Sequence, residues 1–171
     1  MNFKEIYIIF NEIYLDIISD KEKKEIIETM GLEKYKYINK TPTPDEFNNL
    51  TEAVGWGRRD NKIVQDALNN TLYSMCVYDM DKLIGYGRII GDKTIFLYIH
   101  DVMVIPEYQG KQIGTGIMKE LLKQIDEYKK ENPNIRTYLG ASKGKEYFYE
   151  KFGFVSRPNE ELGAGMILYN E

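Results

Sequence analysis

The sequence predicts an α/β or α+β domain built on a mixed, mostly antiparallel central sheet that is flanked by helices. Three observations lead to this fold class. Short β-rich segments follow one another in the first half of the chain, a strand-helix-strand unit lies in the middle, and a glycine-rich turn at 109–116 joins that strand to its helix. This order is typical of two-layer domains with a mixed sheet. With 171 residues, of which 43% are apolar, the chain is expected to form one domain, 1–171, around one core.

The first 31 residues predict a helical N-terminal extension. Ile6, Ile9 and Ile13 follow helical spacing, and Ser19 and Glu22 form the pattern of a capping box that opens a second short helix before Gly31. Acidic residues interrupt the apolar run. We therefore expect neither a signal peptide nor a membrane-spanning helix here, but a segment that packs on the domain or on a second subunit.

Alternation, caps and breakers predict the elements that follow. A first strand at 35–39 is ended by Thr41-Pro-Thr-Pro44, and a helix follows over 45–54. After the loop Gly55-Trp56-Gly57, Asp60 caps a helix that reaches about Leu68. Three β-rich runs then form a meander, at 72–78, 83–90 and 95–105.

The second half of the chain predicts two more helices and three more strands. Ile113, Ile117, Leu121 and Ile125 recur every four residues opposite charged side chains, which predicts a one-faced helix that Asn132-Pro133 ends. The remaining elements are a strand at 135–139, a helix at 145–152, and a closing pair of strands at 154–156 and 166–169.

Charge and cysteine content narrow the function classes. A net charge of −4 disfavours a general role in binding nucleic acid or anionic membranes, although Lys111, Lys143 and Lys145 could gather around one anionic cofactor. Cys76 is the only cysteine, so an internal disulfide and a cysteine-rich metal site are excluded. Cys76 itself is predicted to be a small buried apolar residue. We expect a reducing, cytoplasmic compartment and no metal.

The turn Gln109-Gly-Lys-Gln-Ile-Gly-Thr-Gly116 predicts an anion-binding site, because glycines let the backbone approach a ligand and a helix start offers unpaired N–H groups. A Walker loop needs a lysine directly after its last glycine, whereas Lys111 comes early. A dinucleotide fingerprint needs a small residue where Lys119 stands, and an acid about 20 residues further on that the chain lacks. Alternatively, the glycines only shape a tight strand-to-helix connection.

Two motifs carry a family resemblance. Val104-Ile-Pro-Glu-Tyr-Gln-Gly-Lys-Gln-Ile-Gly114 resembles the acetyl-CoA loop of the GNAT superfamily of N-acetyltransferases, with Gln112 where the family usually has its first glycine. Further on, Phe148-Tyr-Glu-Lys-Phe-Gly-Phe154 resembles the Tyr-x-x-x-Gly-Phe segment of the same family. The two motifs occur in the family's order.

The resemblance implies a GNAT-like acyl-CoA N-acyltransferase fold from about residue 33 to the end, with acetyl-CoA as co-substrate. In this family the pyrophosphate lies on backbone amides of the loop, and the pantetheine arm runs beside the preceding strand. The residues expected to contact acetyl-CoA are Val102, Met103, Val104, Gln109, Gly110, Lys111, Gln112, Ile113, Gly114, Thr115, Ser142, Lys145 and Tyr149. Many relatives place an asparagine before the later helix, where this chain has Ala141-Ser142-Lys143.

Acetyl transfer to an amine needs a neutral nucleophile and a proton for the departing thiolate. An alkylamine loses its proton near pH 7 at a cost of roughly 4 to 5 kcal/mol, which justifies either a base or an acceptor site that binds the neutral amine. His100 is the only histidine of the chain and is the candidate base, with a structural histidine as the alternative. Strand alternation puts His100 on one face with Tyr98, Val102 and Val104. Asp101 faces the other way unless a bulge intervenes.

The resemblance makes Tyr149 the candidate acid for the thiolate, with Tyr147 in reserve and a packing tyrosine as the alternative. A modest change of environment would bring a tyrosine close to a thiol in pKa. Trp56 and Arg58, with the neighbouring Arg59, could select the acceptor or belong to a solvated loop. Arg157 could line the same side, or simply lie in an edge turn.

The function predicted from these residues is transfer of acetyl from acetyl-CoA directly to a primary amine of a small molecule or peptide. A catalytically silent acyl-CoA-binding regulatory module would keep the loop without needing His100 or Tyr149. A purely structural interaction domain would need neither the loop nor these side chains. A homodimer is a family expectation only.

Overall fold

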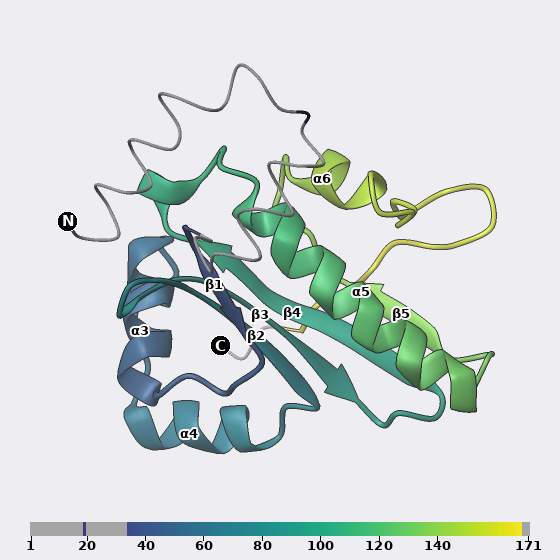
Figure 1. Ribbon diagram of the computed structural model, residues 1–171. Helices are drawn as coiled ribbons and strands as arrows, with labels where there is room; N and C mark the ends of the chain where they lie inside the picture. The colour runs from purple at the N-terminus through teal and green to yellow at the C-terminus, as the bar shows by residue number, and fades with distance from the viewer. Residues whose placement is uncertain (1–18, 20–33, 169–171) are drawn as a thin grey trace. The chain divides into compact units, whose positions relative to one another are not determined.

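The computed structural model describes residue 19 and residues 34–168, and its centre is a five-stranded sheet (Figure 1). The strands lie in the order β1 (Lys36–Ile38), β2 (Tyr73–Asp79), β3 (Lys82–Gly91), β4 (Phe96–Val104) and β5 (Arg136–Leu139). Strands β2, β3 and β4 are antiparallel, and β5 is parallel to β4. The predicted mixed sheet with mostly antiparallel strands is therefore confirmed.

The chain divides into two compact units, Met1–Lys36 and Tyr37–Glu171. The helices of the described residues and nearly all of the sheet belong to the second unit. The predicted helical extension 1–31 lies outside the described residues, apart from Ser19.

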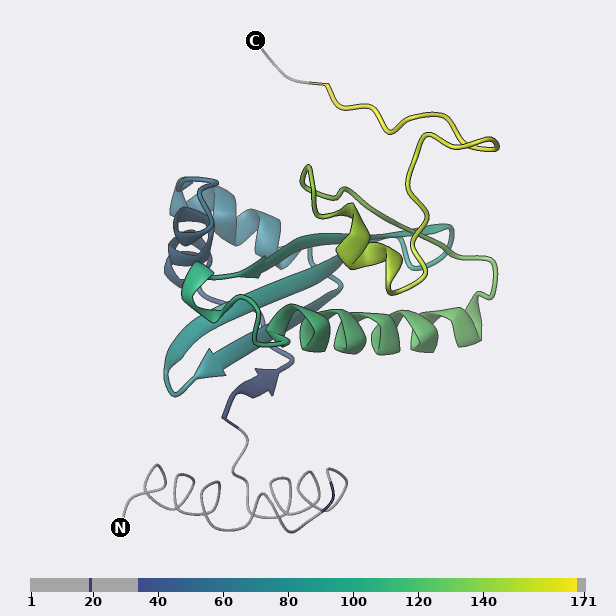
Figure 2. The same ribbon diagram turned by 90° about the horizontal axis from the view of Figure 1, so that it is seen from above.

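Helices cover both faces of the sheet within this second unit (Figure 2). On one face lie α3 (Pro44–Ala53) and α4 (Asn61–Asn69), and the ring of Phe47 in α3 meets the ring of Tyr86 in β3 edge-on at 5.8 Å. On the other face lies the long α5 (Ile113–Glu131), which buries its predicted apolar stripe. The short α6 (Glu146–Glu150) follows β5.

Two glycines of β3 let α5 lie close to the sheet. A Cβ added at Gly85 would be 3.1 Å from side-chain carbons of both Ile113 and Ile117. At Gly87 it would be only 2.6 Å from Ile117 Cγ2 and 3.1 Å from Leu121 Cδ1. The helix thus occupies the space that side chains on β3 would need, and its first turn is held beside the end of β4.

A bulge interrupts β4 at Asp101. Tyr86 pairs with Met103 but Arg88 pairs with His100, so Asp101 and Val102 both stand opposite Gly87, and Asp101 has a left-handed φ of 52°. The predicted alternation is therefore wrong here. Val102 faces α5, whereas His100 shares a face with Arg88, which bonds to the carbonyl of Ala67 in α4.

The bulge creates a buried ion pair. Arg88 Nε lies 2.7 Å from Asp101 Oδ2, and the two side chains are only 11% and 7% exposed. Burial opposes ionisation of Asp101, but the hydrogen bond from His100 and the charge of Arg88 outweigh it and hold the pKa of the Asp101 carboxyl below its usual range.

The neighbouring strands β4 and β5 separate at their carboxyl ends. Their parallel pairing runs from Phe96 with Arg136 to Ile99 with Leu139, where β5 ends. Beyond this point the part of β4 from His100 to Val104 has no strand beside it on the β5 side, within the described sheet. A free stretch of backbone therefore borders the gap that opens there.

Two expectations about the end of the chain are wrong over the described residues. We expected strands at 154–156 and 166–169, but residues 154–168 form neither strand nor helix, and residue 169 is not described. Val155, Met166 and Leu168 are 72%, 97% and 91% exposed, so no sheet edge covers their apolar side chains. The helix predicted over 145–152 is also shorter, since α6 spans Glu146–Glu150.

We predict that Gly87→Ala destabilises the fold by about 1–3 kcal/mol, because the new methyl group would overlap Ile117. This loss exceeds the about 0.4–1 kcal/mol that alanine gains by restricting the unfolded chain. Urea unfolding measures the difference. Gly163→Ala is the control, because no atom lies within 4 Å of its added Cβ, and it should stay within about 0.5 kcal/mol of the unchanged protein. An unchanged urea midpoint for Gly87→Ala would contradict the prediction.

The low pKa of Asp101 predicts a pH dependence of stability. Because this pKa is lower in the folded chain, the ion pair stabilises the fold fully above the unfolded pKa of about 3.9, and the contribution is lost as the pH falls through the folded value. From pH 5 to pH 2, the unchanged protein should therefore lose more of its free energy of unfolding than Asp101→Asn does. Parallel curves for the two proteins over this range would show that Asp101 contributes nothing.

Candidate functional site

A cleft of about 880 Å³ lies where β4 separates from β5. Its wall is formed by the end of β4, the 108–115 turn with the start of α5, and the region of α6. The lining residues at these positions are Val102, Met103, Val104, Tyr108, Gln109, Gly110, Gln112, Ile113, Gly114, Thr115, Lys119, Ser142, Lys145, Phe148, Tyr149, Lys151 and Phe152, joined by Val54 and Trp56 from the end of α3. Residues far apart in the sequence thus meet at one site.

The start of α5 presents free peptide N–H groups to this cleft. The first bond of the helix runs from the Gly116 N–H to the Gln112 carbonyl, and no side chain caps the helix. The N–H groups of residues 110–115 find no acceptor among the described residues. A helix of 19 residues adds the positive end of its dipole here. This arrangement favours an anion in the cleft.

The backbone conformation explains why glycine is usual at the position of Gln112. Gln112 has a φ of 63°, in the left-handed region where glycine carries no steric cost and other residues pay on the order of 1–2 kcal/mol. Gln112 therefore holds a backbone conformation that glycine would adopt without this cost. Gln109 stabilises the turn, since its Nε2 donates a hydrogen bond to the Val104 carbonyl at the end of β4, at 2.9 Å.

Charge in the cleft is opposite to the charge of the whole chain. Its lining includes Lys119, Lys145 and Lys151 and contains no carboxylate among the described residues. Lys145 was expected from the sequence, whereas Lys119 and Lys151 were missed. Lys119 lies two turns into α5, on the side of the helix that borders the cleft, which helical spacing from Thr115 would have indicated. Three cations and free amides suit a ligand with several phosphate charges.

Apolar side chains form the rest of the cleft wall. Phe148 meets Phe152 at 5.4 Å and Tyr149 at 5.0 Å, each ring edge-on. A Cβ placed at Gly114 would be 3.4 Å from Phe148, so α6 packs directly on the first turn of α5. The cleft thus combines a polar end for charge with an apolar passage beside Val102 and Val104.

Tyr149 lines the cleft, but the shift of its pKa runs against our expectation. Burial alone raises the pKa of the Tyr149 hydroxyl, so the environment does not bring it closer to an ordinary thiol. The hydroxyl therefore stays protonated at neutral pH. A thiolate formed in the same apolar surroundings would also be a stronger base than in water, so proton transfer from Tyr149 depends on both shifts.

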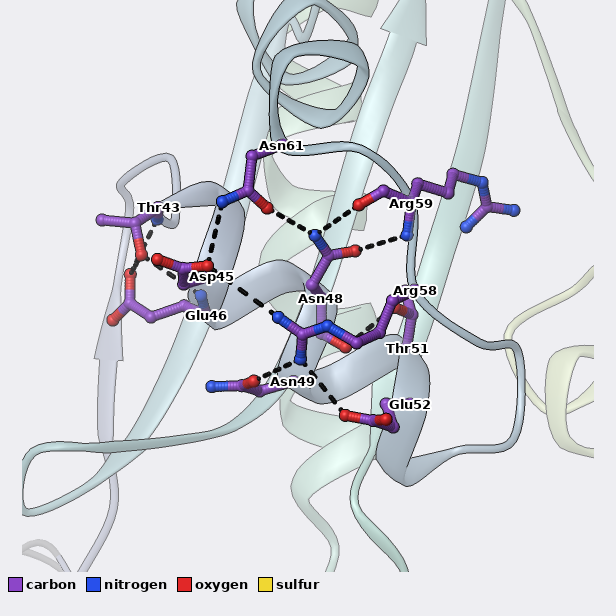
Figure 3. A network of polar contacts seen from close by, with 10 residues as sticks. All are labelled: Thr43, Asp45, Glu46, Asn48, Asn49, Thr51, Glu52, Arg58, Arg59 and Asn61. Atoms are coloured by element: carbon purple, nitrogen blue, oxygen red, sulfur yellow. Dashed lines mark hydrogen bonds and ion pairs between the residues drawn. The ribbon is translucent and has the colours of Figure 1, made fainter.

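A network of polar contacts holds the loop that carries Trp56 (Figure 3). The buried Asn48 amide donates to the Arg59 carbonyl at 2.9 Å and to Asn61 Oδ1 at 2.8 Å, and its oxygen accepts from the Arg59 N–H at 3.0 Å. The Asn48 side chain in α3 thereby holds the backbone of Arg59 and the side chain of Asn61, which begins α4. Trp56, which is 46% exposed, is held at the cleft.

Arg58 belongs to the same network and does not line the cleft. Its guanidinium lies 3.2 Å from Glu52 Oε2, 3.8 Å from Asp45 Oδ1 and 2.8 Å from Asn49 Oδ1 (Figure 3). Arg157 and Lys111 also lie outside the lining, and Lys111 Nζ instead donates to the Glu107 carbonyl at 2.8 Å. The acceptor contacts expected of Arg58 and Arg157 stay predictions.

His100 lies just outside the lining, two residues before Val102, which is about 7 Å along a strand. Its ring is half exposed, and Nδ1 lies 2.8 Å from Asp101 Oδ1. The bulge that separates its face from that of Val102 also brings this carboxylate alongside. His100 thus stands where β5 has ended and β4 is open on that side.

The described residues contain no cluster of three or more histidine, cysteine, aspartate or glutamate side chains arranged to hold a metal ion. None of their helices combines the length and the apolar character that crossing a membrane requires.

The chain is similar in sequence to known acetyltransferases. The sequence model of the acetyltransferase (GNAT) domain family matches residues 42–170. A protein of Prochlorococcus marinus, described as an uncharacterized N-acetyltransferase ycf52-like, is 34% identical over 117 residues, which are 66% of this chain and 63% of that protein. An uncharacterized N-acetyltransferase ycf52 of Pyropia yezoensis is 30% identical over 95% of this chain and 86% of its own length.

A solved structure is similar over most of the chain. The crystal structure of a probable acetyltransferase from Staphylococcus aureus has a TM-score of 0.70 and 29% identity, over 79% of this chain and 99% of that one. The family match covers the sheet from β2 onward, both site motifs and α6. With the cleft, its free amides and these relatives in agreement, the chain belongs to the GNAT family and is an acetyltransferase.

Proposed function

We propose that this acetyltransferase binds acetyl-CoA in the cleft and passes the acetyl group directly to a primary amine of a small molecule or peptide. One observation carries the proposal: free N–H groups at the start of α5 and lysine side chains line a cleft to which the described residues contribute no carboxylate. The donor's pyrophosphate fits the N–H groups of residues 110–115, and its pantetheine arm fits the apolar passage beside Val102 and Val104. When bound, acetyl-CoA supplies an acetyl group activated as a thioester.

The acceptor reaches the cleft from the side of Trp56 and His100 in this proposal. At neutral pH a primary amine arrives protonated, so one proton must leave before nitrogen can attack. His100 Nε2 accepts that proton, directly or through one water, and returns it to solvent.

Tyr149 completes the proton balance. A C–N bond forms as the C–S bond breaks, and the Tyr149 hydroxyl donates its proton to the departing sulfur. Tyr149 then recovers a proton from the second N–H of the acylated nitrogen. The net change converts one ammonium ion into an amide and yields one free thiol and one proton. Burial raises the pKa of the Tyr149 hydroxyl, so the hydroxyl still carries its proton when the C–S bond breaks.

We predict that Gly114→Val weakens coenzyme A binding at least about tenfold, which corresponds to about 1.4 kcal/mol. Its side chain would enter the cleft beside the free N–H groups, between Phe148 and Val104. Gly114→Ala is the control, because its Cβ makes an ordinary contact with Phe148 at 3.4 Å. Calorimetric titration gives both affinities, and Trp56, the single tryptophan, offers a fluorescence signal at the cleft. Equal affinity for Val and Gly would place the ligand elsewhere.

We predict that Tyr149→Phe lowers kcat by about 10²–10⁴-fold, while coenzyme A affinity is kept. Release of free coenzyme A thiol is followed with a panel of acceptors: a polyamine, an arylalkylamine, an aminoglycoside and a peptide with a free N-terminus. Tyr147→Phe is the matched control, because Tyr147 is on the same helix but 71% exposed and outside the cleft. Unchanged kcat in Tyr149→Phe would remove Tyr149 as the acid.

No turnover with any amine, together with tight coenzyme A binding, would contradict transfer to these acceptor classes. Absence of coenzyme A binding would contradict the assignment of the cleft itself. The two results therefore test different parts of the proposal.

A further inference from the structure

The contact between His100 and Asp101 is unusual for neighbours in a β-strand. Successive side chains of a regular strand point to opposite faces, so they cannot hydrogen-bond to each other. Here His100 Nδ1 lies 2.8 Å from Asp101 Oδ1. The bulge makes this possible, since the left-handed backbone at Asp101 redirects its carboxylate. Such a conformation costs energy, although aspartate tolerates it better than most residues do.

The carboxylate is held from the other side by Arg88. Arg88 Nε lies 2.7 Å from Asp101 Oδ2, while Arg88 Nη1 donates to the Ala67 carbonyl at 2.9 Å and to Thr71 Oγ1 at 3.2 Å. Asp101 therefore uses one oxygen for a guanidinium fixed to α4 and the next turn, and the other for His100. Its side chain is 7% exposed and has no room to swing toward solvent.

Arg88 and Asp101 lie in the interior, and His100 lies at the surface. Arg88 and Asp101 are buried, whereas the His100 side chain is 49% exposed, and its ring lies 5.8 Å from that of Tyr98. With Nδ1 occupied by the carboxylate, the accessible edge of the imidazole is Nε2. A hydrogen bond to one ring nitrogen decides which nitrogen carries the proton in the neutral ring.

We propose that Asp101 is a positioning residue that accepts a hydrogen bond from the Nδ1–H of His100. Nε2 is then the unprotonated nitrogen that accepts the proton of the amine, and Arg88 holds the Asp101 carboxylate in place. This inference rests on the proposed role of His100 as the base. The carboxylate does not touch the substrate or take its proton. Once His100 is protonated, Asp101 also stabilises the imidazolium, as a buried carboxylate behind a catalytic histidine does in general.

The single histidine makes the tautomer directly measurable. With ¹⁵N-labelled histidine, long-range ¹H–¹⁵N spectra at pH 9 report one imidazole and show which nitrogen is protonated. The unchanged protein should show Nδ1 protonated and Nε2 bare, and Asp101→Asn should lose this preference. Finding the proton on Nε2 in the unchanged protein would overturn the proposal, whatever the activity. Since this measurement needs no variant, it holds even if Asp101→Asn folds poorly.

Kinetics test whether the carboxylate acts through the histidine. Asp101→Asn should lower kcat for the best amine at least about tenfold, with coenzyme A affinity unchanged. In a His100→Gln background the same substitution should have little further effect, because its partner is gone. An equal loss in both backgrounds would show that Asp101 does not act through His100, which also overturns the proposal.

A second aspartate serves as the matched control. Asp92 accepts the N–H groups of Thr94, Ile95 and Phe96 in the β3–β4 turn, far along the strand from His100. Asp92→Asn should leave the tautomer and kcat as they are. Full turnover in His100→Gln would instead remove His100 as the base. It would thereby contradict the proposed proton transfer while the tautomer spectrum still reports the Asp101 contact separately.

Discussion

The close contact between α5 and β3 is the constraint on which the site depends. Gly85 and Gly87 leave the space that Ile113, Ile117 and Leu121 fill, so the helix lies on the sheet with its first turn beside the end of β4. The free N–H groups of this turn therefore border the cleft that opens between β4 and β5. A side chain at either glycine would push the helix outward and move its first turn away from the end of β4.

Two residues with left-handed backbone lie at or next to the cleft: Gln112 lines it, and Asp101 directly precedes Val102, which lines it. Strain of this kind persists only where the surroundings determine the conformation, and it often marks functional positions. At Gln112 the conformation turns the chain into α5 and frees its first amides. At Asp101 the left-handed conformation brings the carboxylate next to His100 Nδ1 and turns Val102 toward α5. Each deviation supplies a feature of the site that ideal strands and helices lack.

Much of the fold could be predicted because local patterns carry it. Four-residue spacing from Ile113 to Ile125 located α5, and alternation located β2, β3 and β4 to within a few residues. The capping box of Thr43 and Glu46 at the start of α3 was visible in the sequence but was missed. The predicted strands at 154–156 and 166–169 were wrong for a different reason. The sequence around Val155 and Met166 has residue types typical of strands, yet a strand forms only when another strand supplies hydrogen bonds.

By itself the sequence determined the helices and strands from β1 to α6, because these follow from residue types at short spacing, and the resemblance to the GNAT family named most of the residues that line the cleft. Only the tertiary structure decided the face of His100, the partner of Asp101 and the engagement of Arg58 with Glu52. It also added Lys119 and Lys151 to the cleft. The reason is that strand register and the packing of distant segments depend on contacts between residues that no local pattern relates. A single bulge is enough to exchange the two faces of a strand.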